Sequence, residues 1–143
     1  MDANRQVIKA MAMIQRPRDG AWLVSQHTDP TETSFQRPLG GHVEFGEYAL
    51  DTVRREFVEE IGQELADVRL VGVLENIFDY ADGPHHEIVF VYRAAFADPA
   101  AYEIDEQDIR DEVGRSRVMW RATDATTPPL YPAGAGELAA ATF

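Results

Sequence analysis

The sequence predicts one domain of the mixed α and β class, in which helices pack on a mixed β-sheet. Several short β-rich apolar runs are separated by turn residues, and one central segment has the periodicity of an amphipathic helix. The chain has 143 residues, a length that suits one ordinary globular domain. We therefore expect residues 1–143 to form a single unit. The strand pattern alone leaves α/β and α+β organisation open.

The first third of the chain is expected to contain three strands. Residues 6–15 and 21–27 are rich in apolar and β-compatible residues, and the turn signal of residues 17–20 predicts that they form a hairpin. Residues 28–37 are polar and include a proline, so we expect a loop there. A short strand then runs into the Gly40-Gly41 pair.

The later part of the chain adds further strands and a weak final helix. Residues 68–78 and 86–96 predict strands on either side of a turn at residues 82–84. Residues 98–112 are acidic and loop-like, with room for a short helix, and residues 118–122 resemble a last strand. A proline-rich stretch then leads into a weak helix former at the C-terminal end.

A helix is predicted from Tyr48 to Ile61. Its apolar residues recur at helical spacing and form a narrow stripe suited to a core; they are Leu50, Val53, Phe57 and Ile61. Glu47 lies near the expected start of the helix, where the macrodipole favours an acid. Gly62 is well placed to end the helix with a left-handed cap.

A second face of the same helix carries three carboxylates. Glu56, Glu59 and Glu60 lie at positions i, i+3 and i+4 and therefore share one sector. Like charges at this spacing destabilise a helix by a few tenths of a kcal/mol. Oxygen ligands on a rigid element are what Mg²⁺ or Mn²⁺ requires. A solvated helix face is the alternative, and the upstream Gly40-Gly41 turn and Glu47 favour the metal site because they supply a second wall.

The run from Gly41 to Gln63 resembles the Nudix box, whose glycine, arginine and acidic positions have fixed spacings. The matching positions are Gly41, Glu47, Arg55, Glu56, Phe57, Glu59, Glu60 and Gly62. Two departures occur: Gln63 replaces a usual aliphatic residue, and Leu39 separates Pro38 from the glycine pair. Neither departure alters a charged position.

This resemblance implies the Nudix fold, an α/β/α sandwich around a mixed sheet with a loop–helix–loop motif. It also implies an enzyme that hydrolyses a pyrophosphate linkage with Mg²⁺ or Mn²⁺. The implied metal ligands are Glu56, Glu59, Glu60 and the carbonyl oxygen of Gly40. The implied catalytic positions are Glu47, Arg55, Glu56, Glu59 and Glu60, and we expect Arg55 to orient the acids by pairing with Glu47.

The general base and the substrate contacts are less narrowly defined. A box acid such as Glu59 can serve as the base, and the candidates outside the box are Glu75, Glu87, Glu103 and Glu106. Arg37, Phe35 and Glu87 are candidates for substrate binding. Glu87 stands at the start of the strongest strand, and a plain surface acid is the alternative interpretation. The substrate is expected to be a nucleoside diphosphate sugar such as ADP-ribose, or a (deoxy)nucleoside triphosphate.

Composition and charge limit the classes of partner and the cellular location that the sequence predicts. A net charge of −12 argues against a nucleic-acid partner but not against a small anionic nucleotide. No apolar run approaches the length of a membrane span, and the first residues do not resemble a signal peptide. Together with the absence of cysteine, this predicts a cytoplasmic protein. An edge strand of the sheet is compatible with a homodimer. The alternative function is a nucleotide-binding sensor without turnover, which the retained box acids disfavour.

Overall fold

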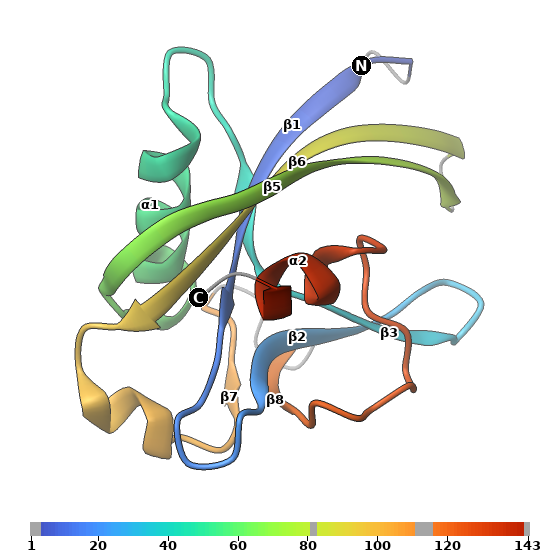
Figure 1. Cartoon of the computed structure of the whole chain (residues 1–143). Helices are drawn as coiled ribbons and strands as arrows, with labels where there is room; N and C mark the ends of the chain where they lie inside the picture. The colour runs from blue at the N-terminus through green and yellow to red at the C-terminus, as the bar shows by residue number, and fades with distance from the viewer. Residues whose placement is uncertain (1–3, 81–82, 111–115, 142–143) are drawn as a thin grey trace.

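The computed structural model describes residues 4–80, 83–110 and 116–141 (Figure 1). Its elements, in chain order, are β1 Gln6–Ile14, β2 Trp22–Thr28, β3 Ser34–Arg37, β4 Leu39–His42, α1 Ala49–Ile61, β5 Leu65–Tyr80, β6 Gly83–Phe96, the 3₁₀-helix η1 Pro99–Glu103, β7 Gln107–Asp108, β8 Arg117–Arg121 and α2 Ala135–Ala141. Over these ranges, no helix combines the length and the apolar character that crossing a membrane requires.

The strands form two four-stranded sheets. The first has the order β4-β1-β6-β5 and is mixed, because β1 runs parallel to β6 while its pairing with β4 and the pairing of β5 with β6 are antiparallel. The second has the order β3-β2-β8-β7 and is antiparallel throughout. The strand β4, which carries the glycine pair, is therefore an edge strand of the mixed sheet.

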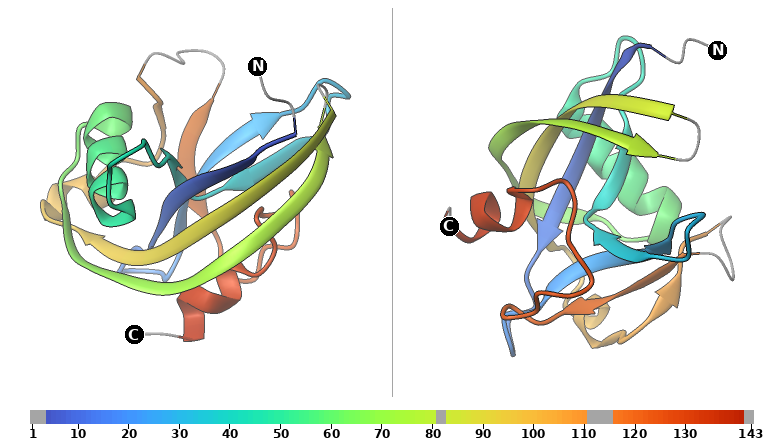
Figure 2. Two further views of the ribbon diagram at one scale, coloured as in Figure 1. Left: turned by 90° about the horizontal axis from the view of Figure 1, so that it is seen from above. Right: turned by 90° about the vertical axis from the view of Figure 1, so that its right-hand side faces the viewer.

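The two α-helices cover opposite faces of the mixed sheet (Figure 2). Alternate residues of a strand point to opposite faces. Accordingly, the even-numbered residues of β1 from Ala10 to Ile14 pack with Val53 and Phe57 of α1. The odd-numbered Met11 and Met13 pack in the cluster that contains Ala135 and Ala139 of α2. The predicted α/β/α sandwich around a mixed sheet is confirmed.

The predicted hairpin of residues 6–15 and 21–27 is wrong. Both segments are strands, but β1 lies in the mixed sheet and β2 in the antiparallel sheet, and a single bridge between Gln15 and Trp22 joins their ends. The turn itself is present, because the amide of Gly20 donates to the carbonyl of Arg16. Apolar patterning identifies a strand but not its partner, and here both strands find partners elsewhere.

The predicted loop of residues 28–37 is also partly wrong, because Ser34–Arg37 is strand β3 and pairs with β2. The preceding turn is closed by Asp29, whose carboxylate accepts hydrogen bonds from the amides of Thr31 and Thr33. Four residues, three of them polar, acquire strand structure here from pairing with β2, which a local pattern does not report.

Several other elements begin or end a few residues away from their predicted boundaries. Strands β5 and β6 extend beyond residues 68–78 and 86–96, so Gly83 and Pro84 of the expected turn belong to β6. Asp82, which completed that turn, and residues 111–112 of the expected acidic loop lie outside the described residues, as do the last two residues of the expected final helix. On α1, Leu50 is 38% exposed, and the buried position next to Val53 is Thr52.

Candidate active site

The start of α1 is organised by Glu47. The Tyr48 side chain forms no capping hydrogen bond, and the Glu47 carboxylate instead accepts from the Thr52 hydroxyl at 2.7 Å and from the Glu44 amide at 3.2 Å. Hydrogen bonds from Arg55, followed by these two bonds, lower the pKa of Glu47 to about 2. Glu47 therefore stays ionised at the positive end of the helix dipole.

The end of α1 is a glycine cap, as predicted. Gly62 has φ 71°, and its amide donates to the carbonyl of Val58 at 3.0 Å. The next amide, that of Gln63, donates to the carbonyl of Phe57 at 3.3 Å. These two bonds satisfy carbonyl groups that the last helical turn leaves without intrahelical partners. The helix that carries the acids thus has defined ends on both sides.

Arg55 is the centre of an ion-pair network on the acidic face. Its Nε and Nη2 atoms donate to the two oxygens of Glu47 at 2.9 and 3.0 Å, which is a bidentate pair. Its Nη1 atom donates to Glu56 Oε1 and to Glu59 Oε2, both at 3.0 Å. The predicted pair between Arg55 and Glu47 is therefore present. It holds the guanidinium where it also orients two of the box acids.

Gly41 permits the carboxylate of Glu56 to lie directly against the backbone of β4. A Cβ atom on Gly41 would lie 2.5 Å from Cδ and 2.6 Å from Oε1 of Glu56, closer than real contacts allow. Burial raises the pKa of Glu56, and the neighbouring Glu59 and Glu47 act in the same direction, while Arg55 opposes them. The site thus holds one half-enclosed carboxylate whose charge is only partly compensated.

Gly40 is required for a different reason. A Cβ atom there would overlap the backbone carbonyl of Ala10 on β1. The close approach follows from the antiparallel pairing of β4 with β1, in which Gly40 lies opposite Met11. The two glycines therefore let one short strand fit tightly between β1 and the acidic face of α1.

The donor set of this face fits a hard divalent cation. Glu56, Glu59 and Glu60 supply only oxygen atoms, and the Glu59 side chain is 55% exposed and reachable from solvent. Among the residues that the structure describes, no three acidic or histidine side chains are already gathered around a common point. Arg55 occupies the space between the carboxylates instead. These oxygen ligands suit a hard divalent cation. Such an ion would also offset the repulsion between Glu56 and the neighbouring carboxylates.

The candidate substrate residues on β3 form a second group. Arg37 Nε donates to His27 Nε2 at 3.3 Å, and the Phe35 ring stacks on His27 with centroids 5.3 Å apart. Tyr80 and Tyr131 lie beside Phe35, with centroid distances of 6.5 and 6.1 Å. The structure therefore places Arg37 and Phe35 in an aromatic and polar cluster of the antiparallel sheet, and in the described part of the chain neither side chain bonds to Arg55.

Glu87 is not a surface acid. It is 4% exposed on β6, forms an ion pair with Lys9 Nζ at 2.7 Å and accepts from the Asn76 amide at 3.2 Å. His42, opposite Lys9 on β4, connects this pair to the box, because its carbonyl oxygen accepts from Arg55. Partial desolvation and the positive charges of Lys9 and Arg37 lower the pKa of His42, against the opposing charge of Glu87.

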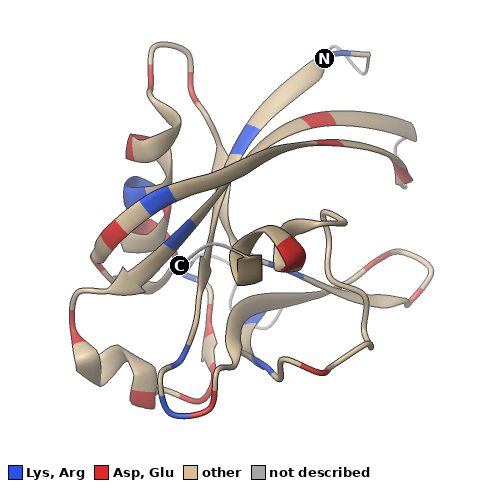
Figure 3. Ribbon diagram, in the orientation of Figure 1, with Lys and Arg blue, Asp and Glu red and all other residues tan. Residues whose placement is uncertain are grey.

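Sequence reasoning missed Lys9 and His42 as neighbours of the site. Each carried a signal: Lys9 is a charged residue within a mostly apolar strand, and His42 directly follows the glycine pair. Neither signal identifies the partner, because Lys9, His42 and Glu87 come from three different strands. Figure 3 shows the charged positions along α1 and the adjoining strands.

Solved structures with the same architecture are known. The MutT NUDIX hydrolase of Burkholderia pseudomallei is 27% identical to this chain, with a TM-score of 0.67, over 94% of this chain and 98% of that one. A NUDIX hydrolase from Nitrosomonas europaea is 20% identical, with a TM-score of 0.52, over 84% of this chain and 74% of that one. The E. coli ORF135 protein is 19% identical, with a TM-score of 0.56, over 96% and 89%.

The fold and the acid-bearing helix beside the glycine pair define the Nudix class of hydrolases. A NUDIX domain model matches residues 5–139, so this chain belongs to the Nudix family. It is a Nudix pyrophosphohydrolase, an enzyme that acts on phosphoanhydride bonds.

Proposed function

We propose that the enzyme hydrolyses the pyrophosphate linkage of a nucleoside diphosphate joined to another group, with Mg²⁺ or Mn²⁺ as cofactor. The observation that carries the proposal is the network in which Arg55 joins Glu47, Glu56 and Glu59 while Glu56 lies against Gly41. Gathering these carboxylates costs free energy, because like charges at helical spacing repel each other. A bound cation would offset this repulsion, and a reaction on a polyphosphate would employ that cation.

Four groups of the chain would hold the cation: the carboxylates of Glu56, Glu59 and Glu60 and the carbonyl oxygen of Gly40. The bound ion would polarise the phosphoanhydride and lower the pKa of a coordinated water. Glu47 fixes Arg55, and Arg55 in turn fixes the rotamers of Glu56 and Glu59. The protein's own contribution is thus the positioning of acids on a rigid helix.

A carboxylate near the reacting phosphorus must accept the proton of the attacking water. In that step the water oxygen bonds to phosphorus, the bridging P–O bond breaks, and the bridging oxygen leaves with the departing phosphate group. Glu59 suits the role better than Glu87, because Glu59 is exposed whereas Glu87 is buried and ion-paired with Lys9. We assign the base to Glu59 on this ground.

The nucleoside would contact the aromatic and polar cluster of the antiparallel sheet. Phe35, with Tyr80 and Tyr131 beside it, offers ring faces on which a base can stack. Arg37 is held by His27 and could contact a phosphate or a ribose. These contacts suit either a nucleoside diphosphate sugar or a nucleoside triphosphate. Glu87 would act indirectly, by holding Lys9.

A product-release screen with Mg²⁺ tests the proposal. The panel contains nucleoside diphosphate sugars, dinucleoside polyphosphates and nucleoside triphosphates, and the Glu59→Gln variant is the matched control. We expect one substrate class to be hydrolysed by the wild type, with the rate falling by roughly 10²–10⁴-fold in the variant. Hydrolysis that survives EDTA, or that is equal in both proteins, would contradict the proposed site.

The cytoplasmic location and a homodimer through an edge strand of the mixed sheet remain predictions. The outer strand β5 is the edge that such a dimer would use, because β4 at the other edge adjoins α1. Sedimentation of the purified protein would decide between monomer and dimer.

A further inference from the structure

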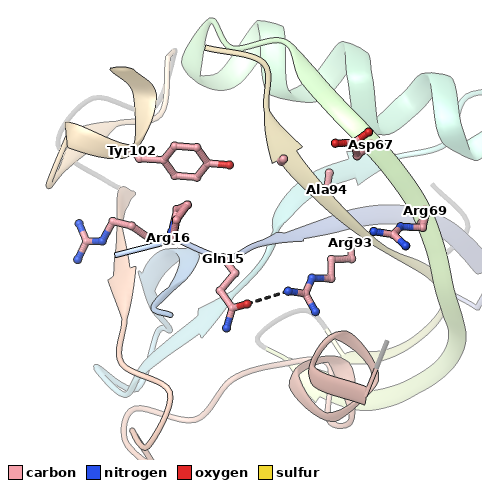
Figure 4. A pocket seen from close by; sticks show the side chains of 9 residues that line it. Gln15, Arg16, Asp67, Arg69, Arg93, Ala94 and Tyr102 are labelled. Carbon is pink, nitrogen blue, oxygen red and sulfur yellow. Dashed lines mark hydrogen bonds between the residues drawn. The ribbon is translucent and has the colours of Figure 1, made fainter. Parts of the chain in front are cut away.

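A hollow of about 330 Å³ lies outside the box, and none of the box residues lines it. Its walls are the residues directly after β1, the start of β5, the end of β6 and η1 (Figure 4). Its polar side chains include Gln15, Asp67, Arg69, Arg93 and Tyr102. Small-molecule sites have volumes of about 300–1,000 Å³, so this hollow suits a small ligand.

Two arginines face each other across the strands that form this hollow. Arg69 of β5 lies directly opposite Arg93 of β6, and Figure 4 shows the two side chains beside each other. Like charges directly opposite each other destabilise a strand pair. The chain has a surplus of acids, yet Arg69 forms no ion pair or hydrogen bond in the described part of the structure. Among the described residues, no carboxylate therefore neutralises Arg69.

The surrounding groups hold Arg93 in place. Arg93 donates to Gln15 Oε1 at 2.7 Å and to the carbonyl of Ala139 at 2.9 Å, and its guanidinium lies over the Trp22 ring. A guanidinium fixed by such bonds loses little further entropy when it binds an anion. Arg16 does not contribute its charge, because its guanidinium points away from the hollow and pairs with Asp19 (Figure 4).

Two further groups define what the hollow can bind. The Tyr102 hydroxyl oxygen accepts from the Phe96 amide at 3.0 Å, which leaves its O–H to donate, and Figure 4 shows the hydroxyl directed toward the hollow. Asp67 lines another wall at a β-bulge, with φ 52°. A β-bulge changes the direction in which the side chains of the bulged residues point. A ligand here would meet cationic donors on one side and a carboxylate on the other.

We propose that this hollow is a second binding site, for a small phosphate monoester that carries hydroxyl groups. Arg69 and Arg93 would contact the phosphate, for which guanidinium groups have matching geometry. Tyr102 would donate a further hydrogen bond to the phosphate, and Asp67 would accept one from a ligand hydroxyl. The site shares no residue with the proposed catalytic machinery.

Calorimetric titration of the full chain in EDTA tests the site with inorganic phosphate and glycerol phosphate as probes. We expect Arg69→Gln to weaken the binding of both probes about tenfold, because a charge-assisted hydrogen bond is lost. Arg117→Gln is the control, since it removes the same charge from an exposed position on β8. It should change the affinity by less than about twofold, as expected for a distant surface charge. Equal losses in the two variants would refute the site.

Asp67→Asn provides an independent test with the opposite sign. Asparagine tolerates the left-handed backbone at this position, so the fold should persist. Removing the carboxylate should tighten inorganic phosphate binding by about threefold to fivefold, because a like charge no longer faces the anion. Glycerol phosphate should bind the wild type more tightly than inorganic phosphate does.

Amide chemical-shift mapping locates the binding. The expected shifts are at Ala94, Ala95 and Tyr102, which line the hollow. The proposal fails if the wild type binds neither probe, if the shifts map to the box, or if Asp67→Asn weakens phosphate binding. Because no metal or turnover is needed, such a failure would leave the proposed hydrolase function standing.

Discussion

At the scale of single residues, the contact between Gly41 and Glu56 constrains the position of a carboxylate of the acidic face. Replacing Gly41 with alanine would place a methyl group in the space of the Glu56 carboxylate. We expect Gly41→Ala to lower kcat by about a hundredfold, because a displacement near 1 Å in a catalytic constellation costs that much. Circular dichroism should show an intact fold, since the displaced group is a side chain near the surface.

The matched control for this substitution is Gly136→Ala. A Cβ atom at Gly136 would lie 3.5 Å from a Leu130 methyl group, an ordinary contact. This variant adds the same methyl group in helix α2 and should keep wild-type kcat. If Gly41→Ala is as active as Gly136→Ala, the carboxylate of Glu56 does not need its present position.

Glu47 makes a pH-dependent contribution to stability. Its folded-state pKa of about 2 lies below the ordinary value of 4.5, so its ionised form stabilises the fold above pH 4.5. That contribution is lost as the pH falls from about 4.5 to about 2. We therefore expect the melting-temperature difference between wild type and Glu47→Gln to shrink across this window.

The comparison with Glu47→Gln is needed because Asp19 also has a pKa lowered to about 2 by its hydrogen bond with Arg16. Both proteins lose the Asp19 contribution equally, so the difference isolates Glu47. Differential scanning calorimetry from neutral pH down to the end of the window measures it. A difference that stays constant with pH would show that the Glu47 charge is not what Arg55 and Thr52 stabilise.

At the scale of elements, the end of α1 depends on a residue from a distant loop. No basic residue lies in the last turn of the helix, and Arg110 lies against Gly62, with its Nη1 atom 3.5 Å from the Val58 carbonyl. The Arg110 amide also donates to the Glu60 carbonyl at 2.9 Å. A positive charge at a helix C-terminus is favourable, so Arg110 supplies the charge that α1 lacks.

Substitutions at this helix end should be coupled. Gly62→Ala should cost about 1–2 kcal/mol, because alanine resists the left-handed backbone, and a little more because its Cβ would overlap Arg110. Arg110→Gln should cost about 0.5 kcal/mol by loss of the charge at the helix end. Urea unfolding of both single variants and the double variant measures the coupling. The double variant should lose less than the sum, and strict additivity would contradict the contact.

The success of sequence reasoning differs between elements for a physical reason. The predicted helix, its glycine cap and the pair between Glu47 and Arg55 depend on residues within a few helical turns, and all three are present. The assignment of β1 and β2 to different sheets depends on strand partners far along the chain. The burial of Glu87 depends equally on Lys9, which arrives from another strand. Local spacing encodes the former interactions and carries no information about the latter.

The whole molecule presents the acidic face of α1 by packing the opposite face into the core. Val53, Phe57 and Ile61 are buried against the mixed sheet, so the helix cannot rotate to separate its acids. Phe57 packs edge-to-face on Phe96 of β6, with ring centroids 6.4 Å apart. Core burial therefore maintains the charge repulsion at the surface. The stability of the entire domain should respond to a cation that relieves it.

We expect Mg²⁺ to raise the melting temperature of the wild type. A ligand that binds only the folded state adds about 2.7 kcal/mol at a hundredfold excess over its Kd, which corresponds to several degrees for a domain of this size. Glu56→Gln should abolish this response. It should leave the metal-free melting temperature unchanged or higher, because the surroundings of Glu56 disfavour its charge overall, as its raised pKa indicates.

Asp51→Asn, a change on the same helix outside the acidic face, should keep the full Mg²⁺ response. Two melting curves per protein, with Mg²⁺ and with EDTA, decide the matter. A wild-type curve insensitive to Mg²⁺, or a Glu56→Gln protein that still responds fully, would show that the cation does not bind at the carboxylates on the acidic face of α1.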